Sequence, residues 1–212
     1  KPKYISPWAE YTALVDFTNN GASNKGKWPN ATLLDGGNGY LYGTTYTGGT
    51  HDFGTLFKFR ISDETLTTIV NFTGNSSPNP GKFPVSQLCK ASDGLIYGTT
   101  GNGGGSNAGV IFRLNPVNDA VTAIIEFTNL AGNFQGAGPF AGLVEGNDGN
   151  LYGSTQYGGS GDHGTIFRLT PGGAFTHKLV EFTGTTGNFK GRKPYATMVK
   201  GGDGTLYGST LE

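Results

Sequence analysis

The sequence predicts an all-β fold, a four-bladed β-propeller of 55-residue, four-stranded antiparallel repeats, with one blade split between the N- and C-termini. Three observations carry this prediction. A Tyr-Gly motif occurs four times at a constant spacing of 55 residues, with its tyrosines at Tyr42, Tyr97, Tyr152 and Tyr207. Short β-prone runs alternate with glycine-rich turns, and no helical periodicity interrupts them. The 38 glycines and 12% aromatic residues are typical of a packed, turn-rich fold.

The first two strands of each unit form a predicted β-hairpin. In the first complete unit, the runs 31–35 and 40–45 flank a turn that contains Asn38-Gly39. The later units have Asp-Gly at this place, and both dipeptides favour a type I′ turn, which needs positive φ at both central residues. Turn chemistry therefore accounts for the recurring carboxylates Asp93, Asp148 and Asp203, which we interpret as turn residues and not as a catalytic or metal-binding set.

Two further strands complete the unit. The glycine-rich loop 48–54 leads to an alternating strand at 55–59, and a fourth strand is expected at 67–72. Near the N-terminus, 12–17 matches the fourth strand and Lys3 to Ile5 matches the third. Four short strands joined by tight turns describe one antiparallel blade.

A Gly-x-x-Pro loop ends each unit, and its proline directs the chain into the next blade because it cannot continue a strand ladder. We expect a single domain over residues 1–212. Its units are 31–85, 86–140, 141–195 and a split unit made of 1–30 with 196–212. Sharing a blade between the chain ends would close the ring and cover two sheet edges.

The charge balance excludes several classes of partner. Fifteen basic and fifteen acidic side chains cancel, so no long-range field attracts nucleic acid or anionic membrane. No apolar run reaches the ~20 residues of a membrane-spanning helix. The single cysteine, Cys89, has Leu34, Val144 and Val199 as its counterparts, so we interpret it as a small apolar strand residue.

The repeated residues resemble the GloVer repeats of long bacterial secreted proteins, whose pattern is approximately D-G-x-L-Y-G-T-T followed by G-G and G-T-[IV]-F. Asp148 to Phe167 is a close instance, and the resemblance covers nearly the whole chain. It implies a β-propeller-like extracellular repeat of unassigned activity. It transfers no catalytic residue, and no cofactor is expected.

One face of the predicted propeller gathers aromatic and basic side chains. The loop that enters the first strand and the loop between the second and third strands open on this face. Aromatic rings and polar loops suit sugars, and the basic groups suit an acidic polysaccharide. The candidate ligand-binding residues are Trp28, Phe83, Phe140, Tyr195, Lys27, Lys82 and Arg192. The competing interpretation is that these aromatic rings pack between blades.

No catalytic or metal-binding constellation is evident. His51 and His163 occupy different places in their loops, and the intervening unit has no histidine there. Asp52 and Asp162 occupy a Gly-Gly-x-x-Asp pattern that could belong to a calcium loop, but each loop offers one carboxylate where Ca²⁺ needs six or more oxygens.

Two other sets of polar residues need an interpretation. Glu126 and Glu181 lie between apolar residues of the outermost strand, and we assign them to its solvated face. Three sequons make Asn30, Asn71 and Asn75 candidate N-glycosylation sites.

These observations leave three hypotheses of function open. The leading one is a secreted, non-enzymatic structural or binding module, which in a sharper version assembles head to tail into a surface or matrix fibre through its split blade. The alternative is a lectin-like propeller that binds extracellular polysaccharide. The third is a polysaccharide-active hydrolase or lyase. The chain could also be one piece of a longer array of repeats.

Overall fold

The computed structural model describes residues 12–18, 26–75, 78–129 and 136–212, which form strands, turns and loops. Within these ranges there is no helix that could cross a bilayer. The first two sheets contain β1 (Leu34–Asp35), β2 (Tyr40–Thr45), β3 (Thr55–Arg60), β4 (Thr65–Asn71), β5 (Cys89–Lys90), β6 (Ile96–Thr100), β7 (Val110–Asn115) and β8 (Ala120–Glu126). The remaining strands are β9 (Val144–Glu145), β10 (Leu151–Thr155), β11 (Thr165–Leu169), β12 (Phe175–Glu181), β13 (Val199–Lys200) and β14 (Leu206–Tyr207).

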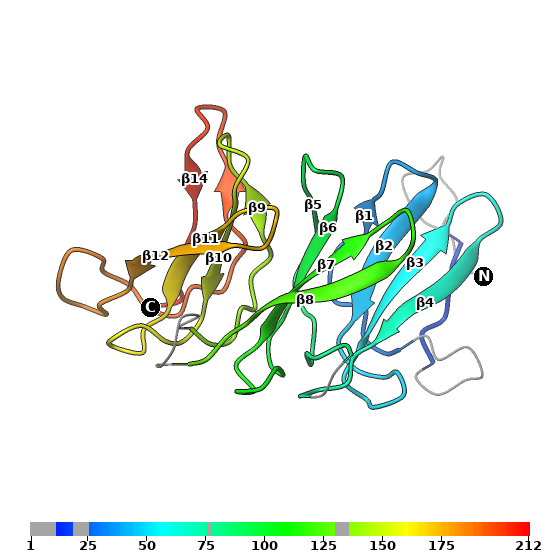
Figure 1. Ribbon diagram of the computed structural model, residues 1–212, viewed down its shortest axis with the longest axis horizontal. Coiled ribbons are helices and arrows are strands. Elements are labelled where there is room, and N and C mark those ends of the chain that lie inside the picture. Colours follow the sequence, from blue (N-terminus) through cyan, green and yellow to red (C-terminus); the bar gives the residue numbers. More distant parts are fainter. Residues whose placement is uncertain (1–11, 19–25, 76–77, 130–135) are drawn as a thin grey trace.

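Each sheet is an antiparallel meander in which consecutive strands are neighbours. Three sheets have four strands, and β13 pairs only with β14 in the described part of the chain. In Figure 1 the sheet β1–β4 lies on the right, β5–β8 in the middle and β9–β12 on the left, and the β13–β14 hairpin stands beside β9. The first strands of all four sheets line one hollow of about 340 Å³. The all-β, repeated-sheet prediction is confirmed, whereas a ring of four blades closed within one chain stays a prediction.

The hairpins form as predicted, but their turns are of a different type from the one predicted. In the second unit, Ala91 N–H donates to the Leu95 carbonyl and Gly94 N–H donates to the Ala91 carbonyl, each at 3.0 Å. Of the Asp93-Gly94 pair, only Gly94 has positive φ, at 82°. This is the pattern of a three-residue loop with a glycine bulge, so the type I′ prediction was wrong. Asp-Gly fits both turns, because either one needs a residue with positive φ at the glycine.

In three of the four Tyr-Gly motifs the glycine lies beneath an aromatic ring, whereas Gly208 of the fourth faces Met198. Gly98 on β6 is directly opposite Phe112 on β7. A Cβ atom at Gly98 would stand 2.3 Å from the Phe112 ring and 2.7 Å from Leu88. The same arrangement joins Gly43 to Phe57 and Gly153 to Phe167. Only glycine leaves room for this ring, which explains why the motif keeps a residue of low β-propensity inside a strand.

The hydrophobic core lies between the sheets and repeats with the sequence. We call the two sides of a sheet its leading face, which packs on the preceding sheet, and its trailing face, which packs on the following one. The first core cluster joins the trailing face of the first sheet to the leading face of the second, and its members are Tyr42, Leu56, Val70, Phe72, Leu88, Ile96, Phe112 and Leu114. The second cluster contains the residues 55 positions later, together with three alanines. Ring centroids of Phe72 and Phe112 are 5.4 Å apart, and those of Phe127 and Phe167 are 5.3 Å apart.

The N-terminal segment departs from the prediction. Residues 12–17 do not form the expected fourth strand, although Phe17 packs on Phe57 with ring centroids 5.2 Å apart. The third-strand partner proposed for this segment, Lys3 to Ile5, lies outside the described residues. A strand needs a hydrogen-bonded neighbour, and none of the described residues supplies one here. The segment therefore contributes side chains to the leading face of the first sheet without extending its ladder.

Candidate functional site

The Gly-x-x-Pro loops connect neighbouring units through one residue with unusual backbone geometry. Phe83 has φ of 59°, and its N–H donates to the Phe53 carbonyl of its own unit at 2.9 Å. Its own carbonyl accepts from Gly101 N–H at 3.2 Å. Trp28, Gly138 and Lys193 occupy the same place in their units and have φ between 56° and 63°. Positive φ is rare for bulky residues, and here two backbone hydrogen bonds, one within the unit and one to the next unit, hold it in place.

The structure divides the candidate aromatic residues into two groups. Trp28 and Phe83 flank Tyr46, which stacks on Phe83 with centroids 5.0 Å apart and lies 6.2 Å from Trp28. Phe140 and Tyr195 stack on each other at 5.6 Å and occupy a place two residues later in their units. Trp28 and Tyr195 are 53% and 46% exposed, while Phe83 and Phe140 are half-buried. Phe83 and Phe140 therefore pack between loops, whereas ligand binding at the exposed Trp28 and Tyr195 rings stays a prediction.

The three candidate basic residues have partners. Lys27 Nζ lies 4.5 Å from the centre of the Trp28 ring, and Lys82 Nζ lies 4.9 Å from that of Phe53, both within cation–π range. Arg192 forms an ion pair with Glu212. A ligand at this face would meet the lysines above aromatic rings, whereas Arg192 would first have to leave Glu212.

The glycine-rich loops use their acidic residues internally. Asp52 Oδ1 accepts from Gly48 N–H at 2.8 Å, and Asp162 Oδ1 accepts from Gly158 N–H at 2.7 Å. Asn107 takes the same role in the second unit by accepting from Gly103 N–H at 3.2 Å. An amide can replace the carboxylate because the role needs only an acceptor. In the described ranges, no three His, Cys, Asp or Glu side chains gather where they could hold a metal ion.

The acidic residues of the outermost strands reach these same loops. Glu126 Oε2 accepts from Gly105 N–H at 2.7 Å. Glu181 Oε2 accepts from Ser160 N–H at 3.0 Å and from its hydroxyl at 2.6 Å. Glu126 is exposed and Glu181 is half-buried, so both lie on the solvated side of the strand as predicted, and the hydrogen bonds to the loops are an additional finding. Each ties the fourth strand to the loop before the third.

The turn carboxylates have a second partner besides the turn. Asp93 Oδ1 accepts from Leu95 N–H, and its Oδ2 accepts from the Tyr97 hydroxyl at 2.7 Å. Tyr97 also donates to the carbonyl oxygen of Pro171 in the next unit. Burial, followed by this Asp93 bond, raises the pKa of Tyr97 above its ordinary value. The carboxylates therefore orient the motif tyrosines.

Cys89 lacks the surroundings of a nucleophile, and His51 and His163 make local contacts within the described loops. Burial raises the pKa of the Cys89 thiol to about 11, and the side chain packs at the edge of the second core cluster. A reactive thiol needs a lowered pKa. His51 bonds to Thr50 next to it, and the His163 carbonyl accepts from Lys193 N–H at 2.8 Å.

The sequons differ in exposure. Asn30 and Asn75 are exposed, whereas Asn71 is half-buried, and its Oδ1 accepts from Thr50 N–H at 3.1 Å. This hydrogen bond and partial burial make the Asn71 side chain less accessible to modification. Asn30 and Asn75 therefore remain the better candidates for modification.

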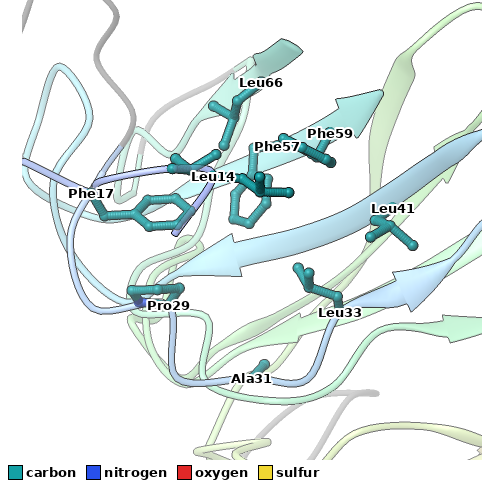
Figure 2. A pocket seen from close by; sticks show the side chains of 10 residues that line it. Leu14, Phe17, Pro29, Ala31, Leu33, Leu41, Phe57, Phe59 and Leu66 are labelled. Carbon is teal, nitrogen blue, oxygen red and sulfur yellow. The ribbon is translucent and has the colours of Figure 1, made fainter. Parts of the chain in front are cut away.

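The leading face of the first sheet is an apolar surface that the site prediction missed. Leu33 is 45% exposed, although its counterparts Leu88 and Leu143 are 3% and 4% exposed. With Leu41, Phe57 and neighbouring apolar residues it lines a hollow of about 310 Å³. Figure 2 shows these side chains converging from the segment before β1 and from β2, β3 and β4, with Leu14 and Phe17 at one side. In the other units this space is part of a core cluster.

The trailing face of β13–β14 is a second exposed apolar surface. Tyr207 is 52% exposed and Val199 is 64% exposed, whereas Tyr42 and Tyr97 are fully buried. The Tyr207 hydroxyl still donates to Asp203 at 2.9 Å, so the hairpin keeps its local geometry. The sequence contained a signal for both surfaces, because Leu33 and Tyr207 match positions that the period places in the core.

Solved structures with a similar chain path have low sequence identity. A protein provisionally assigned as an oxidoreductase (glucose dehydrogenase) from Thermus thermophilus is 17% identical, with a TM-score of 0.43 over 73% of this chain and 46% of that one. A protein of unknown function from Dyadobacter fermentans is 11% identical, with a TM-score of 0.42 over 79% and 51%. An endo-1,5-alpha-L-arabinanase from Thermotoga petrophila is 14% identical, with a TM-score of 0.42 over 84% and 46%. The chain spans about half the length of these structures.

No curated protein matches the sequence. The repeat itself does have a match, over residues 4–212, which includes every strand described above. The chain therefore belongs to the Gloeobacter/Verrucomicrobia repeat family.

Proposed function

We propose that this chain is a non-enzymatic, extracellular structural module that associates head to tail with further copies of itself. The observation that carries the proposal is the pair of exposed terminal faces. The leading face at Leu33 and the trailing face at Tyr207 are the two halves of an interface that the chain already forms twice inside itself. Burying one such large apolar side chain contributes roughly 1.5–3 kcal/mol.

The placement of the two faces favours a second copy as the occupant. Leu33 and Tyr207 are 45% and 52% exposed, so the two faces do not cover each other within one chain. Within the chain, Tyr42 and Leu88 belong to one core cluster. Between two copies, Tyr207 of one copy would pack with Leu33 of the next in the same way. A contact between two different surfaces that does not close on itself propagates into a filament.

Light scattering on the purified chain over a wide concentration range tests the association. We expect the mean mass to rise with concentration, and Leu33→Asp to abolish the rise because it places a charge in the apolar interface. Ile61→Asp is the matched control, since Ile61 is 53% exposed in the turn after β3. A single-chain mass at every concentration would refute the proposal.

Mixing two blocked variants tests the head-to-tail geometry itself. Leu33→Asp keeps the trailing face and Tyr207→Asp keeps the leading face, so each should remain a single chain alone. An equimolar mixture should give a dimer and nothing larger. A mixture that stays at the single-chain mass while the wild type assembles would show that other surfaces make the contact.

The remaining parts of the proposal have their own tests. Cell fractionation with immunodetection tests the extracellular location, which rests on the repeat resemblance. Turnover above background on a panel of glycosides, esters and peptides would contradict the non-enzymatic part.

A second candidate function, binding of an acidic polysaccharide, is favoured by Trp28 and Lys27. The indole is 53% exposed, and Lys27 Nζ lies over it. Such a pair offers an aromatic platform beside a positive charge. Trp28→Ala should weaken binding of polygalacturonate by about 1 kcal/mol or more without changing stability. A loss of stability with unchanged binding would identify the ring as a packing residue.

A further inference from the structure

The junction between the second and third units contains a hollow that the junction before it lacks. Its volume is about 320 Å³, at the lower end of the range of small-molecule sites. Asn102, Asn107 and Asn129 line it from the second unit, and Tyr157 and Asp162 line it from the third. It is distinct from both terminal faces and does not depend on head-to-tail association.

Four substitutions between equivalent positions explain why the hollow exists. At the first junction, Tyr46, Phe53, Lys82 and Phe83 pack together through ring stacking and a cation–π contact. The residues 55 positions later are Gly101, Ala108, Ala137 and Gly138. The Phe140 ring takes the space over Gly101, where a Cβ atom would stand 2.2 Å from it. The same ring lies 2.7 Å from a Cβ atom built at Gly138, so the open space is that of the large side chains replaced by Ala108 and Ala137.

The lining has the chemistry of a site for an uncharged, hydroxyl-rich ligand. Tyr157 presents a ring that is 40% exposed, on which a sugar ring can stack. Asn107 Oδ1 and Asp162 Oδ1 are held by the backbone of their own loops, which fixes both side chains and leaves the Asn107 amide N–H groups and Asp162 Oδ2 for a ligand. Asn102 adds a second amide with both donor and acceptor capacity.

The charge of the lining separates this hollow from the Trp28 face. Asp162 is the one ionisable carboxylate among its described lining residues, and none of them is basic. An anionic sugar would be repelled here, whereas Lys27 and Lys82 would attract it at the first two loops. We infer that this hollow is a binding site for a neutral sugar, formed between the second and third units.

The test uses the intact chain with saturation-transfer NMR and calorimetry. The probes are D-glucose, D-galactose, D-mannose and L-arabinose, with D-glucuronate as the charged comparison. We expect saturable binding of at least one neutral sugar and weaker binding of glucuronate. Tyr157→Ala and Asn102→Ala should each weaken that binding roughly tenfold.

Two further variants make the result specific to this hollow. Ala108→Phe supplies the side chain found at Phe53 and should abolish binding by filling the space. Trp28→Ala is the matched aromatic control and should leave binding unchanged. Absence of saturable binding to all four neutral sugars would overturn the inference, as would binding that is lost in Trp28→Ala and kept in Tyr157→Ala.

Discussion

Removing one hydroxyl group, in Tyr97→Phe, tests whether the motif tyrosines stabilise the junction between units. The Tyr97 side chain is fully buried, and its hydroxyl donates to Asp93 Oδ2 at 2.7 Å and to the Pro171 carbonyl of the next unit. A hydrogen bond to a charged group contributes about 1.5–3 kcal/mol, and the substitution also leaves the Pro171 acceptor without this donor. We therefore expect the free energy of unfolding to fall by about 2 kcal/mol.

Tyr207→Phe is the matched control, because Tyr207 makes the same bond to Asp203 at 2.9 Å but is 52% exposed. Water can replace that bond, so the expected change is below about 0.5 kcal/mol. Urea denaturation followed by tyrosine and tryptophan fluorescence measures both values, and the slopes should match that of the wild type. Equal losses in the two variants would refute the argument that burial and the inter-unit contact give this bond its strength.

Three further predictions concern the same core. Gly98→Ala should destabilise the chain by roughly 1–3 kcal/mol, since its Cβ atom would overlap the Phe112 ring. The control is Gly202→Ala, because a Cβ atom there would have no other atom within 4 Å. Equal melting temperatures of the two variants would contradict the packing argument. Stability should fall at alkaline pH because burial raises the folded pKa of Tyr97 and of Cys89, so the unfolded chain loses these protons first. For Cys89 this contribution is complete below about pH 9 and is lost as the pH rises through about 11, and Tyr97→Phe should flatten the remaining pH dependence in urea titrations. Cys89→Val, which copies Val144 and Val199, should change stability by less than about 1.5 kcal/mol; a larger loss would show that the thiol does more than fill space.

The period made the core and the strand order predictable from sequence. Tyr42, Phe57 and Phe72 repeat without drift, and alternation along a strand fixes which face each side chain occupies. The contacts that escaped prediction join loops to distant strands. Glu126 reaches Gly105 across 21 residues, and strand periodicity says nothing about a side chain that bends toward a loop. The turn type escaped because loop length, and not the Asp-Gly pair alone, determines it.

The candidate site was predicted less well than the core. Trp28 and Tyr195 were grouped because both lie next to the proline of a Gly-x-x-Pro motif, but Trp28 precedes that proline and Tyr195 follows it, so they occupy different positions of the repeat. The hollow beside Tyr157 forms because small residues replace the large side chains of the first junction. A search for aromatic and basic residues does not detect such a position. A comparison of equivalent positions, such as Phe83 with Gly138, would have shown that a large side chain is replaced by a small one.

The phenylalanine pairs that join the sheets have a consequence for how the molecule opens. Because each sheet shares its core only with its neighbours, the free energy of folding is a sum of coupling terms between adjacent units. The second sheet is coupled on both sides, through Phe72–Phe112 and Phe127–Phe167. Among the residues that the structure describes, the β13–β14 hairpin is coupled on one side only. Fraying should therefore begin at this hairpin and travel inward, so that amide hydrogens of β6 and β7 exchange with solvent last. Any surface that covers Tyr207 would slow exchange along the whole series.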